Sequence, residues 1–312
     1  GSSHTFAELT TAIRALAGGL TARGLEAGTI VAVMAPNMPE FAIVFHGAAV
    51  AGLATTTLNP TYTAEEIRHQ LIDSGAVLLF TIEALAPLAT EAIEGTAVTD
   101  VIFLDKAEGS QSLVGMYATP SNQVAVDVDD HVVTLPYSSG TTGLAKGVML
   151  THNNIVSNAL NCINGLQYDD NTRYLHAAPM FHAADATSNI AVTMFGGAHI
   201  FINRFEPEET LKLIEQHKVT NCTLVPTMIN MIINTPNANR YDTSSLKRLG
   251  YGASPMPEAV LKAAQELMPT TEFAQAYGMT ELSPLITILA PEFHSFDGPF
   301  AHRVRSAGRA VL

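Results

Sequence analysis

Apolar residues near the start of the chain recur at helical spacing. Leu9, Ile13 and Leu16 fall on one helical stripe within residues 5–24. Thr5 and Glu8 have the spacing of a capping box, in which each residue satisfies a backbone N–H of the first turn. The pattern therefore predicts a helix over residues 5–24, and a second capping box at Thr63 and Glu66 predicts another that ends near residue 75.

Short apolar runs without an in/out alternation lie between these helices and recur along the chain. The predicted strands are residues 29–34, 53–58, 77–81, 132–137, 198–202, 222–226, 248–252, 272–277 and 285–289. Further helices are predicted from 39 to about 51 and from about 151. Such alternation is typical of α/β folds with mainly parallel sheets that helices cover on both faces.

Two stacked, doubly wound lobes are the expected arrangement. The first lobe is predicted over residues 1–128 and the second over 129–312. Residues 109–130 are polar and weakly patterned, and we interpret them as a surface connection between the lobes.

Composition narrows the possible partners. The 312 residues are 47% hydrophobic, with 16 Lys and Arg against 29 Asp and Glu, a net charge of −13. A negative protein repels a phosphate backbone, so nucleic acid is not expected as a partner. Two distant cysteines, Cys162 and Cys222, fit a reducing cytoplasm. The longest apolar run, 41–54, is too short to span a bilayer, and no signal peptide is visible.

A loop rich in glycine, serine and threonine, residues 138–147, follows a predicted strand and contains Lys146. Such a loop is either an ordinary turn or a phosphate cradle. Its position favours the cradle, because ligands of open α/β sheets collect at the carboxyl ends of strands. The spacing is not that of the nucleotide-kinase P-loop, since two residues separate Gly143 from Lys146 and glycine follows the lysine. The loop also lacks the G-x-G-x-x-G pattern of dinucleotide-binding folds.

Several segments together resemble one known family. YSSGTTGLAKGVMLTH (137–152) is similar to the phosphate-loop signature of the adenylate-forming superfamily, which includes acyl- and aryl-CoA synthetases, 4-coumarate-CoA ligases and firefly luciferase. APMFHA (178–183), YGASPMP (251–257) and QAYGMTELSP (275–284) follow in the order of that family, and LNPTYTAEEIRHQL (58–71) resembles its CoA-ligase branch.

The resemblance implies a two-step ligase that forms a carbon–sulfur bond. A fatty or aryl carboxylic acid would attack Mg-ATP to give an acyl-adenylate, and coenzyme A would then displace AMP. The loop would bind the β- and γ-phosphates through Ser138, Ser139, Gly140, Thr141, Thr142, Gly143 and Lys146.

The resemblance also assigns nucleotide contacts in the second lobe. Tyr277 would pack on adenine, Thr280 would bind the α-phosphate, and Glu281 would bind Mg²⁺. The remaining residues of the expected nucleotide pocket are Gly252, Ala253, Ser254, Gln275, Ala276 and Gly278. Taken alone, a buried tyrosine at 277 and a helix N-cap pair at Thr280 and Glu281 would be the better interpretation, and only the surrounding motif favours nucleotide binding.

The acyl group is expected near His182, which matches a family position close to the substrate carboxylate. The catalytic set implied is thus Lys146, His182, Thr280 and Glu281. The predicted acyl-pocket residues are His182, Ala183, Ala184, Ser188, Gly278, Pro284 and Leu285. The small alanines at 183 and 184 argue against a hydroxycinnamate and leave room for a longer or differently shaped acyl group.

Family members are longer than this chain, and the lysine-bearing C-terminal domain that completes adenylation in the family has no counterpart in it. We therefore expect the 312 residues alone to bind nucleotide without efficient adenylation. Two alternatives remain open: an adenylating enzyme that loads a carrier protein, and a non-enzymatic nucleotide- or acyl-adenylate-binding module. A homodimer is also left open.

Overall fold

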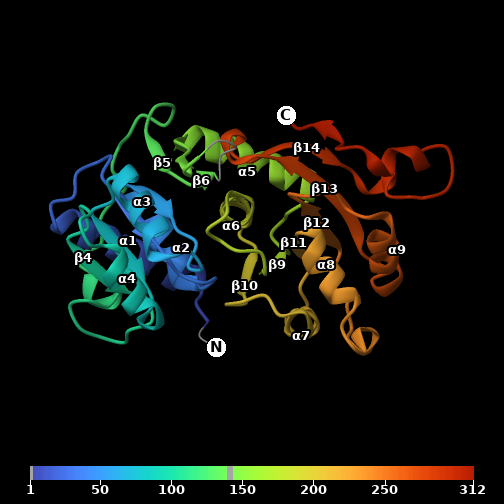
Figure 1. The fold of residues 1–312 in the computed structure, drawn as a ribbon, viewed down its shortest axis with the longest axis horizontal. Helices are drawn as coiled ribbons and strands as arrows, with labels where there is room; N and C mark the ends of the chain where they lie inside the picture. The colour runs from blue at the N-terminus through green and yellow to red at the C-terminus, as the bar shows by residue number, and fades with distance from the viewer. Residues whose placement is uncertain (1–2, 139–142) are drawn as a thin grey trace. The chain divides into compact units, whose positions relative to one another are not determined.

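The computed structural model describes residues 3–138 and 143–312. Its internal contacts divide the chain into two compact units, Gly1–Asn154 and Ile155–Leu312 (Figure 1). The division falls later than the predicted boundary at 128/129, because the strands after residue 130 pair with the sheet of the first unit.

The first unit contains a six-stranded sheet in the order β4-β3-β1-β2-β5-β8. Its strands are β1 (Ile30–Val33), β2 (Ala54–Thr57), β3 (Leu78–Thr81), β4 (Asp100–Phe103), β5 (Val132–Thr134) and β8 (Leu150–Thr151). All neighbours pair in parallel except β5 and β8. Every residue of β2 and β3 is buried, as expected for a parallel sheet covered on both faces.

Four α-helices belong to the described part of this unit: α1 (Phe6–Ala22), α2 (Pro39–Val50), α3 (Ala64–Ser74) and α4 (Ala86–Ala92). Both predicted capping boxes are present, at Thr5 with Glu8 and at Thr63 with Glu66. Gly75 ends α3 at φ 68°, a left-handed conformation that glycine adopts without steric cost. A core cluster beneath α3 and α4 joins them to β1 and β3.

The segment 109–130, predicted to be a surface connection between lobes, packs within the first unit. The backbone N–H of Ala118 donates to Ala15 at 3.1 Å, and that of Ser121 donates to Arg14 at 3.0 Å, so the segment lies along α1. Added Cβ atoms on Gly18 or Gly19 would lie 2.0 Å or less from its backbone oxygens. Small residues of α1 therefore allow this close packing.

The second unit contains a seven-stranded sheet in the order β10-β9-β11-β12-β13-β14-β15. Its strands are β9 (Arg173–His176), β10 (Ala198–Phe201), β11 (Asn221–Leu224), β12 (Arg248–Gly252), β13 (Glu272–Gly278), β14 (Leu285–Leu289) and β15 (Arg309–Ala310). Pairing is parallel from β10 to β13 and antiparallel from β13 to β15. The predicted α/β fold with mainly parallel sheets is confirmed.

Helices of the second unit bury the sheet. They are α5 (His152–Leu166, which begins in the first unit), α6 (Ala183–Phe195), α7 (Pro207–His217), α8 (Pro226–Ile233) and α9 (Glu258–Leu267). A core cluster of buried side chains joins α7, α8 and α9 to β9, β11, β12 and β13. Helix α5 packs closely against β14. A Cβ added to Gly165 would lie only 1.9 Å from the Ile288 side chain, so this position needs glycine.

Candidate functional site

The two flanks of the glycine-rich loop form a small antiparallel hairpin in the first unit. β6 (Tyr137–Ser138) pairs with β7 (Lys146–Gly147), which brings Ser138 opposite Lys146. The Lys146 side chain is exposed, and none of the described residues forms an ion pair with it. Ser139, Gly140, Thr141 and Thr142 of the predicted phosphate loop lie outside the described residues.

Helix α3 holds this hairpin at both ends. The Tyr137 hydroxyl donates to Asp73 at 2.7 Å, and His69 Nε2 lies 3.2 Å from the carbonyl oxygen of Ala145. Burial, and then the Asp73 carboxylate, raises the pKa of Tyr137, so its proton stays available for this bond. The sequence that resembles the CoA-ligase branch (58–71) thus supplies part of the support of the loop.

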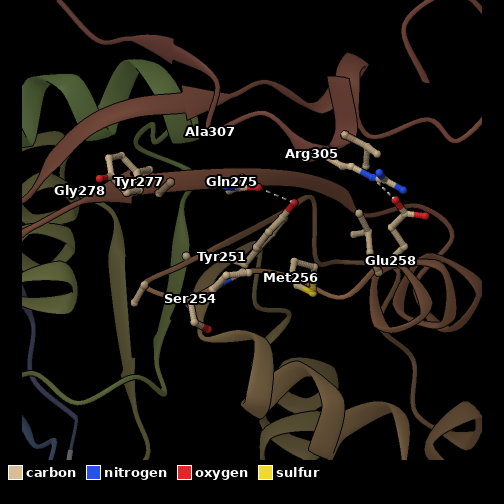
Figure 2. Close-up of a pocket in the computed structure, with 15 residues that line it drawn as sticks. Tyr251, Ser254, Met256, Glu258, Gln275, Tyr277, Gly278, Arg305 and Ala307 are labelled. Atoms are coloured by element: carbon tan, nitrogen blue, oxygen red, sulfur yellow. Dashed lines mark hydrogen bonds and ion pairs between the residues drawn. The ribbon is translucent and has the colours of Figure 1, made fainter. Parts of the chain in front are cut away.

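A cavity of about 510 Å³ lies in the second unit, at the carboxyl ends of β12 and β13 (Figure 2). The predicted nucleotide residues that line it are Gly252, Ala253, Ser254, Gln275, Ala276, Tyr277 and Gly278. This is the edge at which open α/β sheets bind ligands. The structure therefore brings together seven predicted residues from two separate motifs.

Glycine is required at both ends of this cavity. A Cβ on Gly252 would lie 2.1 Å from the Ala276 oxygen, and one on Gly278 would lie 1.8 Å from the Pro284 oxygen. Ala253 has φ 65° in the left-handed region, where a side chain is strained. The strands can therefore approach one another, and the turn after β12 can form, only with small residues.

Tyr277 contributes an exposed aromatic ring, with 52% of its surface accessible. Thr280 and Glu281 follow on a short 3₁₀ turn, η4 (Thr280–Leu282), and do not line the cavity. The N-cap of this turn is Met279, and no side chain caps it. Thr280 is partly buried and Glu281 is exposed, so the carboxylate is accessible from solvent.

Most of the predicted acyl residues lie at the start of α6 or in the segment 283–285; Ser188 lies farther along α6 and Gly278 ends β13. The Thr187 hydroxyl donates to the Ser283 carbonyl at 3.3 Å, which joins these two segments. Asn158 secures the second segment by donating to the Leu285 carbonyl at 2.8 Å and accepting from its N–H at 3.1 Å. The structure thus brings Ala183 and Ala184 into the same region as Pro284 and Leu285.

Two of the predicted acyl-pocket residues, His182 and Ser188, differ in their exposure to solvent. His182 is the N-cap residue of α6 and is exposed, yet the protein around its ring disfavours the charged form and lowers the pKa of the imidazole. Ser188 is 2% exposed, and its hydroxyl lies 3.3 Å from that of Tyr168. Ser188 is therefore already bonded within the core.

Sequence reasoning missed part of the cavity wall. Glu258 of α9 and Arg305 line the cavity and form an ion pair at 2.7 Å. Tyr251 belongs to the motif YGASPMP but is not among its predicted nucleotide residues; it is fully buried and lines the cavity with Met256. Arg305 comes from a segment with no recognisable pattern, so only the fold places it here.

Metal-ligand clusters and membrane-spanning helices are both missing from residues 3–138 and 143–312. They contain no group of three or more His, Cys, Asp or Glu side chains arranged to hold a metal ion. Within the same residues, no helix has both the length and the apolar character needed to cross a membrane.

The amino-acid sequence is similar to those of known enzymes. A family model described as AMP-binding enzyme matches residues 1–312. A 4-coumarate–CoA ligase from Pinus taeda is 35% identical over 99% of this chain and 58% of its own length. The chain thus spans about half the length of the curated relatives it matches.

Solved structures show the same similarity. The N-terminal domain of FACL13 from Mycobacterium tuberculosis superposes with a TM-score of 0.87 at 30% identity, covering 99% of this chain and 75% of that one. A long-chain-fatty-acid–CoA ligase, FadD1, from Archaeoglobus fulgidus gives a TM-score of 0.89 at 27% identity, covering 100% and 63%.

Proposed function

The chain belongs to the family of AMP-binding enzymes, and from this premise we propose that the protein is an ATP-dependent acid–CoA ligase. The carboxylate of a fatty or aryl acid attacks the α-phosphorus of ATP, and pyrophosphate leaves. The sulfur of coenzyme A then attacks the acyl carbon, and AMP leaves. Support comes from relatives named as 4-coumarate– and long-chain-fatty-acid–CoA ligases.

The cavity of the second unit carries this proposal, because two motifs meet there around a space suited to a nucleoside. Its wall combines glycines, which admit a flat base, with the exposed ring of Tyr277. Aromatic faces pack favourably on planar rings. In our proposal, adenine binds between Tyr277 and the turn at Ala253.

Phosphate binding is assigned to the loop of the first unit and to Thr280. Backbone N–H groups, hydroxyls and a mobile ammonium are donors suited to anions. The exposed Lys146 has no ion-pair partner among the described residues, so its charge is available for a phosphate. Neutralising the leaving pyrophosphate is the main electrostatic task of the first step.

Magnesium fits Glu281 as a single protein ligand. The described residues offer no cluster of acidic or histidine ligands, and Mg²⁺ commonly uses one or two carboxylates with substrate phosphates and water. Glu281 is exposed and its carboxylate is a hard oxygen donor. Bound Mg²⁺ would reduce the negative charge that opposes attack of a carboxylate on ATP.

The acyl group is assigned to the region of His182 and segment 283–285. An imidazole whose pKa is lowered stays neutral near pH 7, so it would orient the substrate carboxylate by hydrogen bonding. The methyl side chains of Ala183 and Ala184 leave space for an extended acyl group. This favours fatty acids, with bulky aryl acids as the second class.

A panel of carboxylic acids tests the proposal on the intact protein. AMP and an acyl-CoA should both appear only when acid, Mg-ATP and CoA are present together. AMP without acyl-CoA, combined with acylation of a pantetheinylated carrier protein, would indicate a carrier-loading enzyme. Tight binding of an acyl-sulfamoyl-adenosine with no acid-dependent AMP release would indicate a binding module.

A further inference from the structure

A buried histidine stands directly behind the cavity. His294, 4% exposed, follows the 3₁₀ turn η5 (Pro291–Phe293), and its ring meets that of Tyr251 edge-on with centroids 5.6 Å apart. His294 Nε2 lies 3.0 Å from the Tyr251 hydroxyl oxygen, and Nδ1 lies 3.1 Å from the carbonyl oxygen of Ala290. Both ring nitrogens are thus engaged.

These partners decide where the protons lie. Burial lowers the pKa of His294, so the neutral ring with one N–H is the relevant form near pH 7. A carbonyl oxygen only accepts, so Nδ1 carries the hydrogen and Nε2 is an acceptor. The Tyr251 hydroxyl must therefore donate its single hydrogen to His294.

Tyr251 also faces Gln275, which lines the cavity (Figure 2). The Tyr251 hydroxyl oxygen lies 3.4 Å from Gln275 Oε1, a long separation for a hydrogen bond between oxygens. With its hydrogen directed to His294, Tyr251 offers Gln275 only lone pairs. The favourable partner for a lone pair is the amide NH₂, and a half-turn of the side-chain amide brings it there.

We propose that His294, acting through Tyr251, orients the Gln275 amide with its NH₂ toward Tyr251 and its carbonyl oxygen toward the cavity, and thereby selects 6-aminopurine over 6-oxopurine nucleotides. The inference rests on the proposed nucleotide function of this cavity. An outward carbonyl accepts from the 6-amino group of adenine, whereas it faces the lone pairs of a 6-oxo group.

Gln275 is better suited than the neighbouring polar groups to distinguish a 6-amino group from a 6-oxo group. The Glu258 carboxylate is engaged by Arg305 at 2.7 Å, and the Ser254 hydroxyl can donate or accept and so does not discriminate between the two bases. Within the described lining, Gln275 has the one side-chain amide, whose two ends differ in hydrogen-bonding character. His294 is accordingly a positioning residue.

The test compares dissociation constants for AMP and IMP, which differ at the 6-position, by titration calorimetry. The unchanged protein should prefer AMP by about tenfold or more, the scale of one matched base contact. His294→Leu removes the acceptor, frees the Tyr251 hydrogen for Gln275, and should bring the ratio close to one. Tyr251→Phe removes the same link by another route, and His294→Gln, which restores an acceptor, should recover part of the preference.

His302→Leu is the matched control, because His302 is exposed and does not line the cavity. Equal affinity of the unchanged protein for AMP and IMP would overturn the inference and leave the proposed function standing. An AMP preference retained in folded His294→Leu or Tyr251→Phe would overturn it too. Binding of neither nucleotide would overturn the proposed function itself, and this inference with it.

Discussion

Nδ1 of His176 lies 2.6 Å from a carboxylate oxygen of Asp185, and both side chains are completely enclosed. Asp185 also accepts from the Tyr174 hydroxyl at 3.1 Å, and His176 Nε2 lies 2.9 Å from His199. Asp185 stands in the first turn of α6, one helical turn after His182. The chain of bonds therefore fixes the start of α6 to β9 and β10.

Removing the carboxylate of this pair should destabilise the second unit. We expect Asp185→Ala to lower the free energy of unfolding by about 3 kcal/mol, because buried partners lose their acceptor. Urea unfolding measures the change. Asp170→Ala, at an exposed aspartate, should change the value by less than about 0.5 kcal/mol. Equal effects of the two substitutions would show that the buried pair contributes nothing.

Acid should destabilise the first unit through His46. Burial lowers its pKa to about 4, whereas in the unfolded chain the value is near 6.5, so the unfolded state binds the proton more tightly. Stability is thus lost as pH falls from about 6.5 to 4, by on the order of 3 kcal/mol. Unfolding measured at pH 7 and pH 4 should show a smaller loss for His46→Leu. The control is His302→Leu, at an exposed position, whose free energy of unfolding should change with pH as it does in the unchanged protein. The same pH dependence in His46→Leu would contradict the prediction.

The hydroxyl of Tyr137 should matter for ATP binding as well as for folding. Tyr137→Phe removes the bond to Asp73, which costs about 1 kcal/mol of stability, and it frees one end of the loop hairpin. We expect the dissociation constant for Mg-ATP to rise several-fold. Adding Asp73→Asn should change it little further, since the two residues act through one bond. Tyr62→Phe is the control, because its hydroxyl bonds to no described residue; additive effects of the first two changes would exclude this coupling.

Replacing Ala253 with glycine should stabilise the protein. At φ 65° an alanine is strained, so Ala253→Gly should raise the free energy of unfolding by about 1 kcal/mol. The same replacement at Ala276, within β13, should lower it by about 0.5–1 kcal/mol, because glycine weakens a strand. Thermal unfolding distinguishes the two. Destabilisation by both substitutions would show that the left-handed turn is not strained.

Glu281→Gln tests the magnesium assignment. The exposed side chain has little structural role, so in the intact protein we expect unchanged stability, a higher Mg²⁺ requirement and a loss of about 100-fold in kcat for adenylation. Glu266→Gln, an exposed position of α9, should leave both constants unchanged. A Mg²⁺ dependence that is the same in both variants would place the metal elsewhere.

Much of the fold follows from local patterns. The capping boxes located the starts of α1 and α3, and apolar runs located β2, β3 and β12. β9 went unpredicted because it contains Arg173 and His176, and the histidine is buried only because Asp185 pairs with it from α6. β4 begins at Asp100, whose charge obscures a short run.

The candidate site likewise contains residues that the sequence identifies and residues that it does not. Residues within the contiguous motifs, such as Gly252 and Tyr277, could be identified because their neighbours along the chain carry the signal. Arg305 and His294 could not, since each acquires its role from a partner far away in sequence, Glu258 and Tyr251. Pairings of that kind exist only in the folded protein.

The attachment of the loop hairpin to α3 bears on protein design. Tyr137 and Ala145 contact residues roughly seventy positions earlier in the chain, so the sequence 137–147 does not contain all that shapes its own ends. Grafted alone onto another scaffold, this segment would lose both anchors and become an ordinary surface turn. A transplant would have to carry α3, with Asp73 and His69, in its present orientation.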